Sequence, residues 1–200
     1  DVSSMLYNEG IEEKFSKNIL EEVKNISVNF TEEIRKRKDL RNLITFTIDP
    51  DTARDFDDAI SIERHSDSGW KLGVHIADVS FYVNSQSKID KEALKRGNSI
   101  YLVDRVIMML PTELTTKLCS LTPNEDHLSH SVEMHISDDG DLLSFDTFPA
   151  VINSKCRLTY NQVQKLIENK EGHKIPEDIS VKIRQLYPLV KKIREKRVNQ

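Results

Sequence analysis

The sequence predicts an α+β fold in which a mixed, largely antiparallel sheet is flanked by helices. Apolar residues recur at helical spacing near both ends of the chain, and they alternate with polar residues in its middle. The strand and helix patterns are intermixed, without the regular alternation of a parallel α/β protein. With 200 residues, 38% of them hydrophobic and only 6 Gly and 6 Pro, the chain can bury a sizeable core.

Residues 1–42 have the pattern of a helical entry segment, and we expect the main domain to occupy residues 43–200. A shorter charged helix is predicted to start at Thr31. The apolar stripe of the first helix consists of Phe15, Ile19, Leu20, Val23 and Ile26.

In the middle of the chain, apolar and polar residues alternate with a period of two, which is typical of strands. Asp90 is expected to cap a short helix that Gly97 ends, and a second short helix is expected over residues 111–118. The strands predicted in this region cover residues 43–48, 59–62, 71–79 and 99–103.

The second half of the chain predicts a hairpin and two helices. Strands at 132–136 and 142–148 are joined by a turn at 138–141, and another strand follows at 151–158. Thr159 and Gln162 have capping-box spacing ahead of a helix that Gly172 is placed to end. Pro176 is expected to start the last helix, and Pro188 to kink or restart it.

Composition excludes several classes of protein. The longest apolar stretch, residues 106–110, is far too short to span a membrane, and the first twenty residues lack a signal-peptide core. Two cysteines cannot build a disulfide framework, so a reducing cytoplasm is expected. The formal net charge of −4 gives no sign of polyanion binding, and the basic run at 182–197 is typical of a solvated helix face.

Four carboxylates lie within ten positions, at the end of one predicted strand, in a short loop and at the start of the next strand. They are Asp49, Asp55, Asp57 and Asp58. Carboxylates gathered at one end of a sheet repel one another unless a cation neutralises them, and hard oxygen ligands suit Mg²⁺ or Mn²⁺. The favoured chemistry is therefore metal-assisted phosphoryl hydrolysis. On spacing alone, a solvated acidic turn explains these residues as well.

Five ordered blocks of sequence resemble the catalytic RNB domain of the ribonuclease II and ribonuclease R exoribonucleases, with ARDFDDA closest to ribonuclease R. The resemblance extends over about residues 37–170. The blocks are TIDPDTARDFDDAI (47–60), VHIADVSFYV (74–83), IDKEALKRGNSIYL (89–102), MLPTELTTKLCSLTPNED (109–126) and SKCRLTY (154–160).

The resemblance implies a 3′-to-5′ exoribonuclease that hydrolyses single-stranded RNA processively to nucleoside 5′-monophosphates. It implies Mg²⁺, with Mn²⁺ as a substitute, and no small-molecule cofactor. The four aspartates match the catalytic, metal-holding acids of the family. Tyr101 matches a tyrosine that stacks on the last nucleotides, and Tyr160 matches one near the 3′ nucleotide. Arg54 could contact phosphate or balance charge, and a structural salt bridge is the alternative.

The resemblance stops short of the whole family domain. Its later glutamate and an arginine-rich block are not found in residues 1–200, so we expect a truncated RNB domain with little activity alone. Two other classes stay open. One is an inactive RNB-like module that binds RNA or protein, although four acids beside phosphate disfavour it. The other is an unrelated protein that a metal ion stabilises.

Overall fold

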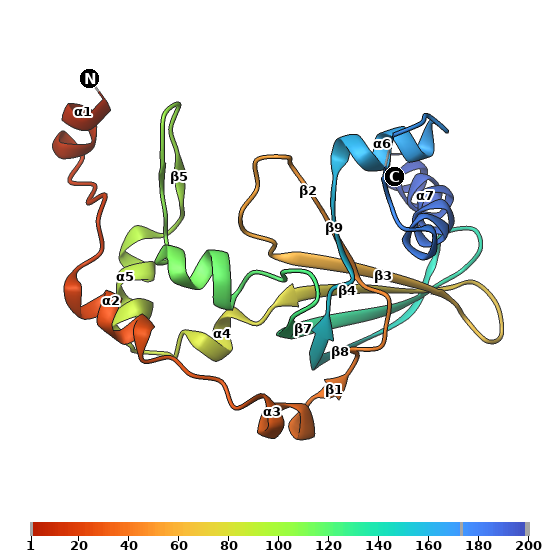
Figure 1. Cartoon of the computed structure of the whole chain (residues 1–200), viewed down its shortest axis with the longest axis horizontal. Coiled ribbons are helices and arrows are strands. Elements are labelled where there is room, and N and C mark those ends of the chain that lie inside the picture. Colours follow the sequence, from red (N-terminus) through yellow and green to blue (C-terminus); the bar gives the residue numbers. More distant parts are fainter. Residues whose placement is uncertain (1, 173, 199–200) are drawn as a thin grey trace. The chain divides into compact units, whose positions relative to one another are not determined.

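The computed structural model describes residues 2–172 and 174–198, which form two compact units (Figure 1). Residues 2–28 pack with Val79–Leu118, and Asn29–Asp78 packs with the described residues from Cys119 onward. These units do not coincide with the predicted boundary after residue 42, because residues 79–118 pack with the N-terminal helices.

The first unit is mainly helical. Helix α2 packs on α5. Of the predicted apolar stripe, Ile19 and Val23 are buried and Leu20 is half-buried, whereas Phe15 and Ile26 lie outside the helix. Ser87, not Asp90, is the N-cap of α5, because the Ser87 hydroxyl accepts the backbone N–H of Asp90 at 3.0 Å. The elements of this unit are α1 (Val2–Asn8), α2 (Lys17–Lys24), α4 (Val79–Tyr82), α5 (Lys88–Arg96), β5 (Ile100–Tyr101), β6 (Val106–Ile107) and the π-helical turn η1 (Leu114–Leu118).

The second unit is built on a seven-stranded sheet with the order β1-β8-β7-β4-β3-β2-β9. All neighbouring pairs are antiparallel except β1–β8 and β2–β9. The predicted mixed, largely antiparallel α+β fold is therefore confirmed. The strands are β1 (Lys38–Asp39), β2 (Phe46–Asp49), β3 (Asp58–Arg64), β4 (Trp70–Ala77), β7 (Asp126–Ile136), β8 (Leu142–Asn153) and β9 (Cys156–Thr159), and the helices are α3 (Phe30–Lys36), α6 (Tyr160–Ile167) and α7 (Glu177–Val198).

The sheet curls so that its two ends come together. In a flat sheet, β8 and β9 would lie five strand spacings apart, about 24 Å. Only Ser154 and Lys155 separate these strands, and three Cα steps span at most about 11 Å. The backbone N–H of Lys155 also donates to the carbonyl of Thr45, at 2.8 Å. Strand β2, which ends at Asp49, pairs with β3 on one side and with β9 on the other.

Helices α6 and α7 bury an apolar core against one face of this sheet. Pro188 is predicted to kink or restart the last helix. Helix α7 continues through Pro188, so the restart is wrong. Packing of Leu186 and Leu189 on either side outweighs the hydrogen bond that proline removes. The buried cluster consists of Phe46, Ile62, Leu72, Ile136, Leu158, Leu166, Ile175, Ile179, Ile183, Leu186 and Leu189.

Several element boundaries differ from the prediction. Strand β7 begins at Asp126 instead of residue 132, because polar Ser129 and Ser131 are buried on the second face of the sheet and hide the alternation. Helix α6 ends at Ile167, well before Gly172. Among the described helices, none combines the length and apolar character needed to cross a membrane.

Candidate active site

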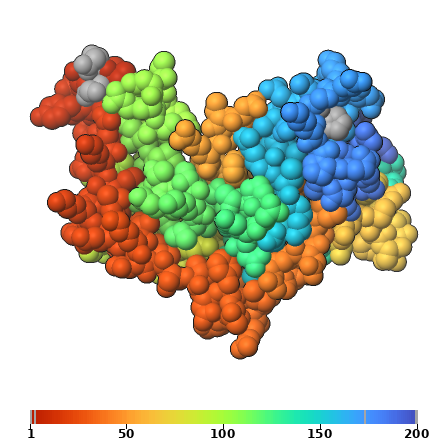
Figure 2. Space-filling model, in the orientation of Figure 1, coloured from red at the N-terminus to blue at the C-terminus, as the bar shows by residue number. Residues whose placement is uncertain are grey.

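The acidic residues lie where β2 ends and β3 begins, within the second unit. Strands β2 and β3 are antiparallel neighbours, so Asp49 and Asp58 come at the same end of adjacent strands. Residues 50–57 form the loop between them, which is orange in Figure 1 and reaches the surface in Figure 2. The fold thus gathers at one place the acids that the sequence spreads over ten positions.

The four carboxylates differ in their exposure to water. Asp49 is only 8% exposed, and its Oδ2 atom accepts a hydrogen bond from the hydroxyl of Thr47 at 2.6 Å. Asp55 is half-buried, whereas Asp57 and Asp58 are exposed. Asp49 is therefore fixed in orientation, and the other acids face a more open surface.

The carboxylates are close enough to act on one another. Burial raises the pKa of Asp49, and the charges of Asp58 and Asp55 raise it further, while the Thr47 hydrogen bond and the charge of Arg157 oppose the rise. Partial desolvation raises the pKa of Asp57, followed by the charges of Asp55, Asp58 and Asp49. All four predicted acids therefore belong to one electrostatic cluster, which we call the acidic cluster.

The donor set of the acidic cluster suits Mg²⁺ or Mn²⁺. Its members all offer carboxylate oxygens. After burial, the charges of the neighbouring carboxylates raise the pKa of Asp49 and Asp57, and a divalent cation relieves such repulsion. In this conformation, no three His, Cys, Asp or Glu side chains of the described residues converge with the geometry of a metal site. The acidic cluster therefore suits the ion in the type of its ligand atoms and in its negative charge.

Backbone hydrogen bonds hold the end of the acidic loop in place. The N–H of Phe56 donates to the hydroxyl of Ser120 at 3.1 Å, and the carbonyl of Phe56 accepts the N–H of Leu121 at 2.8 Å. The carbonyl of Asp57 accepts the N–H of Ala77 at 2.9 Å. The loop is therefore tied to both β4 and the segment that precedes β7.

Sequence reasoning missed two residues that hold the start of the same loop. Arg157 of β9 donates from Nη2 to the carbonyls of Pro50 and Asp51, at 2.6 and 3.3 Å. Asn161 of α6 donates from Nδ2 to Oδ2 of Asp51 at 2.7 Å. Arg157 lies within the SKCRLTY block, but only the pairing of β2 with β9 brings it to the loop.

Tyr160 lies next to the acidic cluster along the β2–β9 ladder. Asp49 pairs with Thr159, and Tyr160 follows as the first residue of α6, with 59% of its surface exposed. The predicted capping box is confirmed: the hydroxyl of Thr159 accepts the N–H of Gln162 at 3.2 Å, and the Gln162 side chain accepts the N–H of Thr159 at 2.9 Å. The cap fixes the direction in which the helix leaves the sheet.

The two remaining predicted site residues are both exposed. Arg54 lies in the acidic loop and forms no ion pair with another described residue, so the salt-bridge alternative is not met there. Tyr101 belongs to the first unit, where the short β5–β6 hairpin presents it with 74% of its surface exposed. Each side chain is accessible to a ligand.

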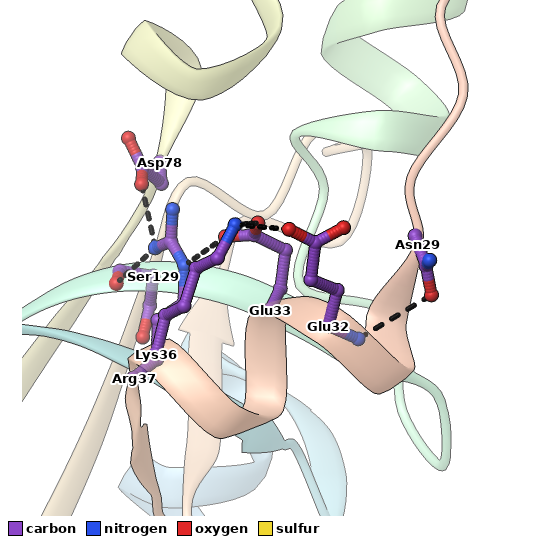
Figure 3. Close-up of polar contacts among 7 residues, drawn as sticks. All are labelled: Asn29, Glu32, Glu33, Lys36, Arg37, Asp78 and Ser129. Atoms are coloured by element: carbon purple, nitrogen blue, oxygen red, sulfur yellow. Dashed lines mark hydrogen bonds and ion pairs between the residues drawn. The ribbon is translucent and has the colours of Figure 1, made fainter.

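A buried ion-pair network supports the strand that neighbours the acidic loop (Figure 3). Nη1 of Arg37 donates to Asp78 at 2.7 Å and to the carbonyl of Ser129 at 3.5 Å, while Nε donates to Glu33 at 3.0 Å. Asp78 directly follows β4, whose last residue, Ala77, binds the carbonyl of Asp57. Arg37 therefore anchors α3 to the end of the sheet that carries the acids.

The chain matches the RNB domain family over residues 37–200 and belongs to that family. It is 47% identical over 168 residues to ribonuclease R of Aquifex aeolicus, a match that covers 84% of this chain and 24% of the relative. It is 49% identical over 162 residues to ribonuclease R of Chlamydia pneumoniae, covering 80% of this chain and 24% of the relative. The chain thus spans about a quarter of the length of these relatives.

A solved structure shares the fold. The structure described as Mycoplasma genitalium RNase R in complex with double-stranded RNA superposes with a TM-score of 0.92 at 33% identity. The match covers 98% of this chain and 35% of that chain. Both compact units of this chain therefore have counterparts in that protein.

Proposed function

We propose that this chain carries the catalytic acids of a 3′-to-5′ exoribonuclease that degrades single-stranded RNA processively to nucleoside 5′-monophosphates. The observation that carries the proposal is the acidic cluster, where β2 ends and β3 begins, in which the neighbouring carboxylates help to raise the pKa of Asp49 and of Asp57. Membership of the RNB domain family and the similarity to ribonuclease R support it. A cytoplasmic location is part of the proposal, because two free cysteines suit a reducing compartment.

Asp49, Asp55, Asp57 and Asp58 would hold Mg²⁺, or Mn²⁺ in its place. Such an ion polarises the scissile phosphate and lowers the pKa of an attacking water. Within the chain, the hydroxyl of Thr47 orients the Asp49 carboxylate, so that one ligand is fixed before any ion arrives. The exposed Asp57 and Asp58 leave the open side of the cluster to the substrate.

Three exposed residues are proposed to contact RNA. Tyr160 and Tyr101 each present a large part of their ring to solvent, and stacking on a ring grips any base without reading its identity. Arg54 offers an exposed cation in the acidic loop, where a phosphate would approach the four aspartates. The N-terminal turn of α6 at residues 159–162 is proposed to face the RNA backbone.

The deciding experiment is digestion of a 5′-labelled single-stranded RNA in Mg²⁺ by the wild-type protein and by the Asp57→Asn variant. Asp139→Asn, in the exposed turn between β7 and β8, is the matched control for loss of one negative charge. We expect a ladder that shortens from the 3′ end, with mononucleotide release, in the wild type and in Asp139→Asn but not in Asp57→Asn.

We expect the 200-residue chain alone to cleave slowly, because it spans about a quarter of ribonuclease R. The digestion is therefore repeated with the longest natural chain that contains this sequence. RNA binding without cleavage by that longer chain would overturn the enzyme proposal in favour of an inactive RNA-binding module. Cleavage that survives Asp57→Asn would remove the acidic cluster from the mechanism.

A further inference from the structure

Arg157 lies beside the acidic cluster without being one of the residues proposed above. In the parallel ladder between β2 and β9, Arg157 pairs with Thr47, and Thr159 pairs with Asp49. Side chains two residues apart on a strand point to the same face of a sheet. Arg157 therefore shares a face with the carboxylate of Asp49 and with the hydroxyl of Thr47 that orients it.

One guanidinium contacts both ends of the acidic loop. Nη2 of Arg157 donates to the carbonyls of Pro50 and Asp51 at the start of the loop. At the end of the loop, the Phe56 ring lies under the same guanidinium, with 5.4 Å between the guanidinium carbon and the ring centroid. The four residues between these contacts include Arg54 and Asp55, so Arg157 closes the loop across its base.

Arg157 occupies this position at a cost. Its Nε atom is buried and has no hydrogen-bond partner among the described residues. A buried donor without a partner costs about 1 to 3 kcal/mol, and such costs are concentrated at functional sites. The positive charge is also one of the two features that oppose the raised pKa of Asp49. A neutral apolar residue would avoid the cost but would supply neither the carbonyl contacts nor the charge.

We propose that Arg157 is a positioning residue that holds the acidic loop closed, so that its carboxylates can share a divalent cation. The inference rests on the proposed function, because it assigns Arg157 to the same site. Arg157 itself does not contact the reacting atoms in this proposal. Its effect passes through the backbone of Pro50 and Asp51 to the side chains that follow.

Arg64 provides a matched control in the same sheet. Like Arg157, it donates to a backbone carbonyl, that of Gly69 at 3.2 Å, and lies over an aromatic ring, that of Trp70 at 4.2 Å. Arg64 also pairs with Asp138, at the end of β3 away from the acidic loop. Arg64→Gln therefore removes similar contacts without touching the loop.

The test compares the wild-type chain with Arg157→Gln, Arg157→Lys and Arg64→Gln. Hydrogen exchange of the peptide that covers residues 50–57 measures loop closure, and calorimetric titration with Mn²⁺ measures cation binding. In Arg157→Gln we expect the loop amides to exchange at least about tenfold faster and Mn²⁺ affinity to fall about tenfold or more, as for other residues that orient metal ligands. Arg157→Lys, which keeps the charge and one donor, should recover part of both losses.

The outcomes separate this inference from the proposed function. Unchanged loop exchange in Arg157→Gln overturns the positioning role, whatever the cation does. If the loop of Arg157→Gln exchanges faster but Mn²⁺ affinity stays at the wild-type value, the positioning role is also overturned, because loop closure would then not affect cation binding. If the wild-type chain binds no Mn²⁺, the metal-dependent function fails, and with it the claim that Arg157 serves an ion. Exchange within β4 and β7, unchanged in all variants, confirms that the fold is intact.

Discussion

Ser61 and His75 are joined across β3 and β4 by a hydrogen bond of 3.0 Å between the serine Oγ and the histidine Nε2. The Nδ1 atom of His75 forms a hydrogen bond of 2.9 Å with the hydroxyl of Ser131 on β7. That hydroxyl forms another, of 3.1 Å, with the hydroxyl of Ser129. His75 is only 2% exposed, and burial lowers its pKa to about 4. A neutral imidazole therefore bridges three neighbouring strands inside the sheet.

This bridge predicts a dependence of stability on pH. The pKa of His75 is depressed in the folded state, so the unfolded chain takes up a proton first as the pH falls. Neutral His75 contributes fully to the free energy of unfolding above about pH 6.5. This contribution, about 3 kcal/mol, is lost as the pH falls from about 6.5 to 4. Urea unfolding of the wild type and of His75→Gln over pH 4–8 measures it as the difference between the two curves. Parallel curves would exclude this role.

Gly73 leaves the space in which this bridge forms. A Cβ atom at Gly73 would lie 2.3 Å from Oγ of Ser61 and 2.8 Å from Nε2 of His75. We expect Gly73→Ala to lower the free energy of unfolding by about 1 to 3 kcal/mol, measured by urea denaturation. Adding Ser61→Ala should recover part of the loss, since it removes the nearest clashing atom. Strictly additive effects in this double-mutant cycle would argue against the steric explanation.

Arg37 should matter far more to stability than its neighbour Lys36. Arg37→Ala leaves the buried carboxylate of Asp78 and the partly buried carboxylate of Glu33 without this partner, which costs about 3 to 5 kcal/mol. Lys36 also pairs with Glu33, at 3.6 Å, but it is exposed, so Lys36→Ala should cost at most about 1 kcal/mol. Thermal and urea unfolding of the two variants give the comparison. Equal losses would mean that the network in Figure 3 adds nothing beyond helix α3 itself.

Tyr160 should contribute to RNA affinity if it stacks on a base. Tyr160→Ala is then expected to weaken binding of a single-stranded RNA by about 1 to 3 kcal/mol, or roughly 5-fold to 150-fold. Tyr187→Ala on α7, another exposed tyrosine of the same unit, serves as the control. Fluorescence anisotropy with a labelled oligonucleotide reports both affinities. Wild-type affinity in Tyr160→Ala would refute the contact.

The sequence allowed the fold class to be predicted, because period-two alternation and the capping box at Thr159 are local signals. It did not reveal strands β1 and β6, which have two residues each. The start of β7 was hidden by buried serines that hydrogen-bond to each other and to His75. A buried polar network has no apolar pattern to detect.

The acidic cluster could be predicted because its members lie close together in the sequence, and the structure brings all four into one electrostatic group. Arg157 could not be predicted in the same way. Its contact with Pro50 depends on the parallel pairing of β2 with β9, which no local pattern specifies. Long-range register is thus what separates the residues that sequence reasoning found from those that it missed.

The curling of the sheet also sets the order in which the molecule can assemble. The ribosome makes Pro50 107 residues before Arg157, the residue that holds it. During synthesis, the four aspartates therefore emerge long before β9 can pair with β2. Contacts between distant parts of a chain form slowly, since a large loop must close before they give any stabilisation. The contacts of Arg157 with the acidic loop can therefore form only after β9 has been made, and a nascent chain that stops before β9 carries the acids without the arginine proposed to position them.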